Sequence, residues 1–132
     1  MLALSDIREW LKGYDIFENY FVGKLDISKE KAVCVYNRKR SGSPIKAYGD
    51  FSSYDIKAVS LLVHWNNNAV FSEQSAVELF EKIRNEKELI INDIPIYHIA
   101  LQVPEPVSVG TDSKGIYEYV IEFDLYYKRK DD

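Results

Sequence analysis

The stretch from Ala58 to Trp65 constrains the fold of this 132-residue chain more than any other segment. Its sequence AVSLLVHW carries apolar side chains at successive positions, which is typical of a strand that is covered on both faces at the centre of a sheet. Three asparagines, residues 66–68, follow directly, and short amide side chains of this kind bond to nearby backbone and favour turns. We therefore expect a central strand, beginning near Tyr54, that ends at this turn.

The residues after the asparagines predict one long amphipathic helix. Through AVFSEQSAVELFEKIRNEK, residues 69–87, apolar side chains recur at helical spacing, while charged and amide side chains occupy the positions between them. The expected apolar stripe consists of Val70, Ala76, Val77, Phe80 and Ile83. One face of this helix should pack on the sheet, and the other should meet water.

The C-terminal run GIYEYVIEFDLYYKRK, residues 115–130, has the clearest period-two alternation in the chain. It predicts a half-solvated antiparallel strand with an aromatic and aliphatic core face. The core face would carry Tyr117, Tyr119, Ile121, Phe123, Leu125 and Tyr127. The opposite face, called here the acidic face, would carry Glu118, Glu122, Asp124 and Lys128.

The remaining segments predict a short helix, several strands and two connections. Ser5 is expected to cap a short N-terminal helix. Residues 18–26, 30–38, 88–92 and 94–103 have the patterns of strands, and the last two should be joined by a tight bend. Residues 38–53 predict a long exposed loop, and residues 104–115, rich in proline and glycine, predict a turn-forming connection. The expected fold class is α+β in a single domain over residues 1–132: a mostly antiparallel or mixed β-sheet with a long helix packed on one face and a short N-terminal helix.

Composition and charge argue against several classes of protein. The net charge of −4 argues against general binding to nucleic acid or to an anionic membrane through the field of the whole molecule. The single cysteine, Cys34, cannot form an internal disulfide, which favours a reducing, cytosolic environment. No apolar run reaches the roughly 18 residues that span a bilayer, and the N-terminal MLALS is too short for the core of a signal peptide.

Few residues indicate catalysis. His64 and His98 lie among apolar neighbours without the spacing of a shared metal site, so a structural role is favoured for both. Cys34 lies in an apolar strand and no serine occupies a GxSxG elbow, which argues against nucleophilic catalysis. The acidic face could hold paired catalytic acids or a metal, but alternation on a solvated strand produces the same cluster without any chemistry. No glycine motif for phosphate and no cofactor site are indicated.

A basic trio, Arg38, Lys39 and Arg40, opens the long loop and is the strongest local charge in the chain. Such a trio could neutralise phosphates or an acidic protein surface, yet charge that simply keeps a loop solvated is the favoured interpretation. The aromatic residues of the last strand alternate with acids rather than with basic residues. That pattern favours core packing over the stacking of nucleic-acid bases.

The C-terminal segment PEPVSVGTDSKGIYEYVIEFDLYYKR, residues 104–129, resembles the tail terminator, or minor capsid, family of long-tailed bacteriophages and prophages. The residues that carry the resemblance are Pro106, Gly110, Asp112 and Gly115, followed by Tyr117, Glu118, Tyr119 and Phe123. The rest of the chain agrees in order with the helix DIREWLK, the arm GKLD, the strand VCVYNRKR, the strand VSLLVHWNNN and the helix AVELFEKI. The resemblance thus covers nearly the whole chain.

The resemblance implies structural rather than enzymatic work. Proteins of that family form a ring, usually a hexamer, which caps the head-proximal end of the tail tube, stops its growth and joins the tail to the head connector. The implied partners are further copies of this chain, the tail tube protein and the head connector, while DNA passes through the lumen without specific binding. The resemblance also implies a virion protein of the tail or neck, assembled in the cytoplasm of the bacterial host, with no cofactor and no membrane.

Candidate surface residues follow from this implied role, because a closed ring needs two different, complementary surfaces on each subunit. The candidates for contacts with neighbouring subunits or the tube are Arg38, Lys39, Arg40, Lys46, Tyr48, Val109, Asp112 and Lys114. The candidates for facing the lumen are Glu118, Glu122 and Asp124.

Two other functions stay open from the sequence. A head-completion adaptor that closes the capsid portal would place the basic loop near packaged DNA, and would bind isolated portals rather than tails. A small metal-dependent nuclease or hydrolase would use the acidic face and a histidine, and its turnover would be stimulated by metal and lost in Glu122→Gln.

Overall fold

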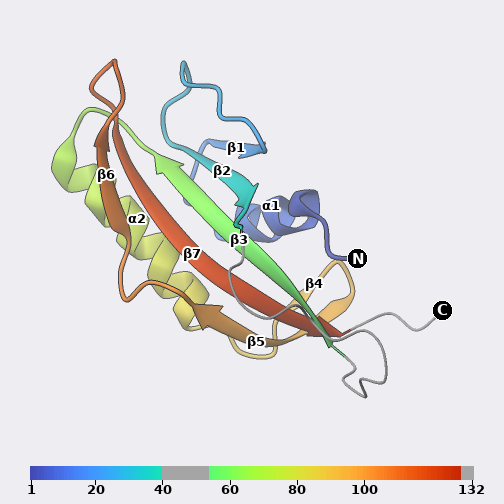
Figure 1. The fold of residues 1–132 in the computed structure, drawn as a ribbon. Helices are drawn as coiled ribbons and strands as arrows, with labels where there is room; N and C mark the ends of the chain where they lie inside the picture. Colours follow the sequence, from blue (N-terminus) through green and yellow to red (C-terminus); the bar gives the residue numbers. More distant parts are fainter. Residues whose placement is uncertain (40–53, 129–132) are drawn as a thin grey trace.

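The computed structural model describes residues 1–39 and 54–128. Within them, nine elements follow one another along the chain (Figure 1). They are α1 (Leu4–Lys12), β1 (Asn19–Val22), β2 (Ala32–Asn37), β3 (Tyr54–His64), α2 (Ala69–Arg84), β4 (Ile90–Ile91), β5 (Ile94–Leu101), β6 (Val107–Thr111) and β7 (Tyr117–Lys128). Neither helix in these residues is long and apolar enough to cross a membrane.

The strands form one mixed sheet in the order β1-β2-β3-β7-β5-β4, with β6 also paired to β7. β3 and β7 are antiparallel along their whole shared length, from Tyr54 opposite Lys128 to His64 opposite Glu118. Since β3 occupies one edge of β7, both β5 and β6 lie along its other edge. β1 runs parallel to β2, which makes the sheet mixed rather than purely antiparallel. The central position predicted for the strand that begins at Tyr54 is confirmed.

One face of the sheet carries the core. Odd-numbered residues of β3 and β7 point to this face, where α1 and α2 cover them; in Figure 1 both helices lie behind the sheet. The fully buried members on the sheet are Val33, Val35, Val59, Leu61, Val63, Ile121, Phe123 and Leu125, and the helices add Ile7, Leu11, Ala76, Leu79 and Ile83. The alternation predicted for the last strand is therefore confirmed.

The helices are short, and the sheet dominates the fold. α1 has 9 residues and α2 has 16, so one long helix on a sheet face, as expected from the sequence, is not what the structure has. Instead, two short helices share the core face. The coarser expectation, helices on a mixed sheet, is confirmed.

The N-terminal helix begins two residues before the start expected from a cap at Ser5. Ala3, not Ser5, occupies the N-cap position, and the Asp6 carboxylate accepts a hydrogen bond from the Ala3 backbone N–H at 2.9 Å. A carboxylate in the first turn can satisfy a free helix N–H from inside the helix, so a hydroxyl cap is not needed. The prediction that Ser5 caps this helix is wrong.

The buried stripe of α2 differs from the predicted one. Ser72, Ser75 and Leu79 are buried, whereas Val70 and Val77 are 63% and 42% exposed. The small serines let the helix approach the sheet, and their hydroxyls are satisfied locally: Ser75 Oγ donates to the Ser72 carbonyl at 2.8 Å. Assigning Val70 and Val77 to the stripe was therefore wrong, whereas Ala76, Phe80 and Ile83 are buried as predicted.

The connection of residues 104–115 is not only a turn. Val107–Thr111 form β6, which pairs with β7 through a bulge between Ser108 and Gly110. Gly110 has a φ of +89°, a conformation that glycine adopts without a steric penalty. Proline thus precedes this short edge strand and glycine lies within it, and every residue of β6 is exposed.

Candidate functional site

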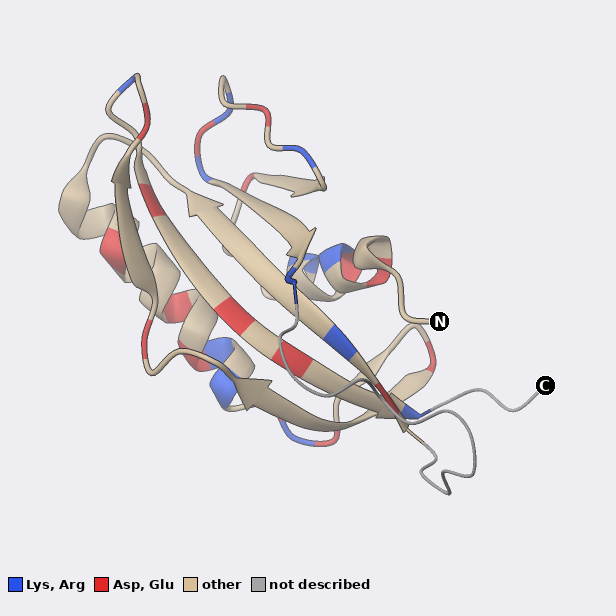
Figure 2. Ribbon diagram, viewed as in Figure 1, with Lys and Arg blue, Asp and Glu red and all other residues tan. Residues whose placement is uncertain are grey.

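The three candidate lumen residues lie together on the face of β7 opposite the helices, where they give the red segments of β7 in Figure 2. Strand pairing sets their neighbours on β3: Glu118 lies opposite His64, Glu122 opposite Ser60, and Asp124 opposite Ala58. The acidic face predicted from the sequence thus exists as one surface of the sheet. The three carboxylates nevertheless have different environments.

Asp124 is paired with Arg38, a residue 86 positions away in the chain. The two side chains are only 6% and 16% exposed, and the Arg38 backbone N–H donates to the Ala58 carbonyl at 3.1 Å. An arginine expected on an outer surface and an aspartate expected in the lumen therefore neutralise each other. Neither charge is displayed to solvent in the subunit.

Glu118 is bonded to His64, which is completely buried. His64 Nδ1 lies 2.9 Å from Glu118 Oε2, and His64 Nε2 lies 3.8 Å from Asp112 Oδ2. His64 Nε2 and Asp112 Oδ2 have no hydrogen-bond partner among the described residues. The favoured structural role of His64 agrees with this burial, while the two flanking carboxylates were not expected.

Asp112 organises the turn between β6 and β7. Its Oδ1 accepts backbone N–H groups of Lys114 at 2.8 Å and Ile116 at 2.9 Å. The bond from Ile116 is the largest cause that lowers the pKa of the Asp112 carboxyl below its ordinary value, and the nearby His64 acts in the same direction. Asp112, proposed from the sequence as a contact residue, therefore also holds its own turn against β3.

Glu122 is the one acidic-face carboxylate without an ion pair in the described part of the chain. It is half-buried, and its backbone carbonyl accepts the N–H of Gln102 at 2.8 Å. Of the three candidate lumen residues, Glu122 thus presents the most available negative charge.

The candidate contact residues are only partly described. Val109 on β6 and Lys114 in the following turn are exposed, as is Lys39 after β2. Arg40, Lys46 and Tyr48, together with nearly all of the predicted exposed loop, lie outside the described residues.

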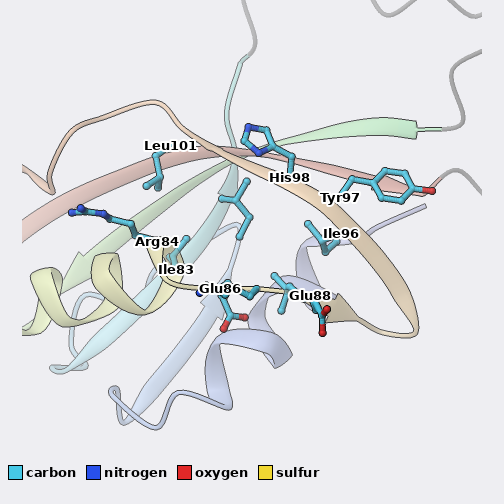
Figure 3. Close-up of a pocket in the computed structure, with 11 residues that line it drawn as sticks. Ile83, Arg84, Glu86, Glu88, Ile96, Tyr97, His98 and Leu101 are labelled. Carbon is cyan, nitrogen blue, oxygen red and sulfur yellow. The ribbon is translucent and has the colours of Figure 1, made fainter.

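No metal-binding group of three or more histidine, cysteine or acidic side chains occurs in residues 1–39 and 54–128. Cys34 is buried, and burial raises the pKa of its thiol above the ordinary value, which disfavours the reactive thiolate. A pocket of about 380 Å³ lies between the end of α2 and β5, where His98 and two glutamates come from different segments. Figure 3 shows His98 pointing away from Glu86 and Glu88, so these groups do not converge on one reacting atom.

Comparison with known proteins identifies the family. A family model described as "Bacteriophage tail terminator protein" matches residues 3–129, nearly the whole chain. Among solved structures, the bacteriophage SPP1 gp17 protein matches with a TM-score of 0.49 and 9% sequence identity, over 92% of this chain and 82% of that one. No curated protein sequence matches significantly. On the family match, the chain belongs to the bacteriophage tail terminator proteins, which are structural components that complete the phage tail and not enzymes.

Proposed function

We propose that this protein forms a closed ring, a hexamer as the family resemblance implies, that caps the head-proximal end of the tail tube and joins it to the head connector. The observation that carries the proposal, beside the family match, is that the sheet ends in two unlike edges: β1 at one side, and β4, β5 and β6 at the other. A ring of identical subunits needs two different surfaces that meet head to tail. Two unlike edges on opposite sides of one rigid sheet meet that need.

The exposed contact candidates fit the same role. Val109 and Lys114 lie at the end of the sheet where β6 turns into β7, and Lys39 follows β2. In this proposal they contact a neighbouring subunit, the tube or the connector. Asp112 supports them by fixing the turn that carries Lys114.

The acidic face is proposed to line the lumen. A negative surface repels the DNA backbone, so DNA can slide past without being held. Because Arg38 pairs with Asp124 and His64 is bonded to Glu118, Glu122 is expected to contribute most of this repulsion.

Electron microscopy and binding assays with the purified protein test the proposal. The expected result is a ring that binds the end of isolated tail tubes. Binding to isolated portals without binding to tubes would instead favour the head-completion adaptor. A protein that stays monomeric at high concentration and binds neither structure would refute both assignments.

A further inference from the structure

An exposed apolar groove lies between α2 and β6. It has a volume of about 460 Å³, with walls that include Val77, Val107 and Tyr119 and a rim that carries Glu73 and Glu105. Val77 and Val107 are 42% and 44% exposed, so apolar surface remains in water on the isolated subunit. Exposed apolar surface with a charged rim is typical of a protein contact site.

A rigid turn with an exposed isoleucine lies in the connection between β1 and β2. The Asp26 carboxylate accepts the Ser28 backbone N–H at 3.0 Å and its hydroxyl at 2.6 Å, and the Lys29 N–H donates to the Asp26 carbonyl at 3.1 Å. These bonds close a turn, called here the Ile27 turn, that leaves Ile27 53% exposed. Because the turn is held by its own bonds, docking it would cost little additional ordering.

The charges around the two features are complementary. Lys24 and Lys29 flank the Ile27 turn, and neither makes an ion pair with a described residue. The groove offers Glu73 and Glu105 on its rim, and they too make no ion pair in the described part of the chain. With Lys24, Asp26 and Lys29, the Ile27 turn carries a net charge of +1, which is opposite in sign to that of the groove rim.

The two features occupy different places on the subunit, although the charge of Lys114, in the β6–β7 turn, acts on Asp26 of the Ile27 turn. The Ile27 turn follows β1, which ends the strand order on one side, while the groove lies under β6 on the far edge of β7. Figure 1 shows β6 and α2 on one side of β3 and the β1–β2 connection on the other. The Ile27 turn does not line the groove of its own subunit, so the two surfaces remain free to meet between copies arranged head to tail.

We propose that the Ile27 turn of one subunit docks in the α2–β6 groove of the next, with Lys24 and Lys29 beside Glu73 and Glu105. This inference rests on the proposed ring and assigns its subunit contact. The occupant of the groove is thus a second copy of this chain, rather than the tail tube or the connector.

Paired substitutions test the contact, with the assembly state of the full-length protein measured by analytical ultracentrifugation and electron microscopy. Ile27→Asp and Val77→Asp should each abolish rings. Ile90→Asp changes an isoleucine on β4 that is even more exposed, at 63% against 53% for Ile27, and should leave rings intact. In a mixture of the two variants, the Ile27→Asp subunit keeps its groove and the Val77→Asp subunit keeps its turn. Each mixed pair can therefore form one contact, so the mixture should give dimers but no rings. Circular dichroism would establish that each variant is folded.

A charge exchange adds a rescue experiment. Lys29→Glu alone and Glu105→Lys alone should each weaken ring assembly by tenfold or more at low salt. The double variant should recover assembly, since every contact then regains a pair of opposite charges.

Equal assembly by Ile27→Asp and wild-type protein would overturn the inference while leaving the proposed function intact. Loss of tube binding by Ile27→Asp with rings unchanged would overturn it too, and would assign the turn to the tube. A wild-type protein that forms no ring and binds no tube would refute the proposed function itself.

Discussion

Removal of the Arg38 side chain tests how much its ion pair with Asp124, on the acidic face, contributes to stability. In Arg38→Ala, the Asp124 carboxylate, 6% exposed in the wild-type subunit, loses the guanidinium that pairs with it. Deleting one partner of a buried ion pair costs about 3–5 kcal/mol, because the remaining charge keeps its desolvation penalty and loses the attraction that offset it. Since the Arg38 side chain keeps 16% of its surface in water, we expect the lower end of that range, about 3 kcal/mol.

For a chain of 132 residues, that loss corresponds to a fall in the melting temperature of roughly 10 °C. Urea unfolding followed by circular dichroism would measure the loss of free energy directly. Arg84→Ala is the matched control, because Arg84 pairs with Glu81 on the surface, with side chains that are 61% and 46% exposed. Such a pair contributes about 0.5 kcal/mol or less.

Replacing both ions by apolar side chains separates the cost of leaving a buried charge from the cost of lost packing. Arg38→Met combined with Asp124→Leu should recover most of the lost stability, because replacing both buried ions by apolar groups is often neutral or stabilising. An Arg38→Ala loss no larger than that of Arg84→Ala would refute the reasoning. So would a double variant as unstable as the single one.

Three further predictions follow from the fold and the site. Leu79→Ala should destabilise the protein by about 3 kcal/mol in urea unfolding, because Leu79 is fully buried, whereas Val77→Ala, at a 42% exposed site, should cost under about 0.5 kcal/mol; the reverse order would contradict the observed burial of these two residues. The pKa of Asp112 is lowered in the folded state, so its contribution to stability is complete above the ordinary value of 3.8 and is lost as pH falls below it; unfolding measured from pH 5 to pH 3 should show a smaller decline in Asp112→Ala than in wild type. Glu122→Lys should make assembled rings retain DNA in a gel-shift assay at low salt, and unchanged mobility would argue against a lumen position for this residue.

Patterns that depend on local spacing predicted much of the fold. The β3 and β7 strands, the tight bend between β4 and β5, and the helix after Asn68 all carry their signals within a few residues. At the bend, Asn92 and Asp93 adopt positive φ values of 49° and 62°, as short polar residues in tight hairpin turns do. Asn68 caps α2 by accepting the Phe71 N–H at 2.9 Å.

The errors arose where tertiary contacts outweigh local pattern. Hydrophobicity alone favoured Val70 and Val77 for the buried stripe of α2, but Ser72 and Ser75 are buried instead, and their hydroxyls donate to main-chain carbonyls. β6 was missed because proline and glycine are also turn signals, and only pairing with β7 makes the segment a strand.

The sequence predicted which residues share the acidic face, but it did not predict their contacts. Alternation placed Glu118, Glu122 and Asp124 on one face, yet it could not reveal which of them would be neutralised. That outcome depends on strand register, which puts His64 opposite Glu118 and brings Arg38 beside Asp124 from a distant part of the chain. The strand pattern around His64 carried no signal for its contact with Asp112.

The interior place of β7 makes the two parts of the sheet depend on a strand that is synthesised after its neighbours. Among the described residues β7 is the last strand, yet β3 flanks it on one edge and β5 and β6 on the other. While the ribosome is still synthesising residues before 117, those strands have no partner at that position, and the sheet stays divided. A chain cut before residue 117 would therefore lack both the groove wall supplied by Tyr119 and the acidic face, and could supply neither surface to the proposed ring.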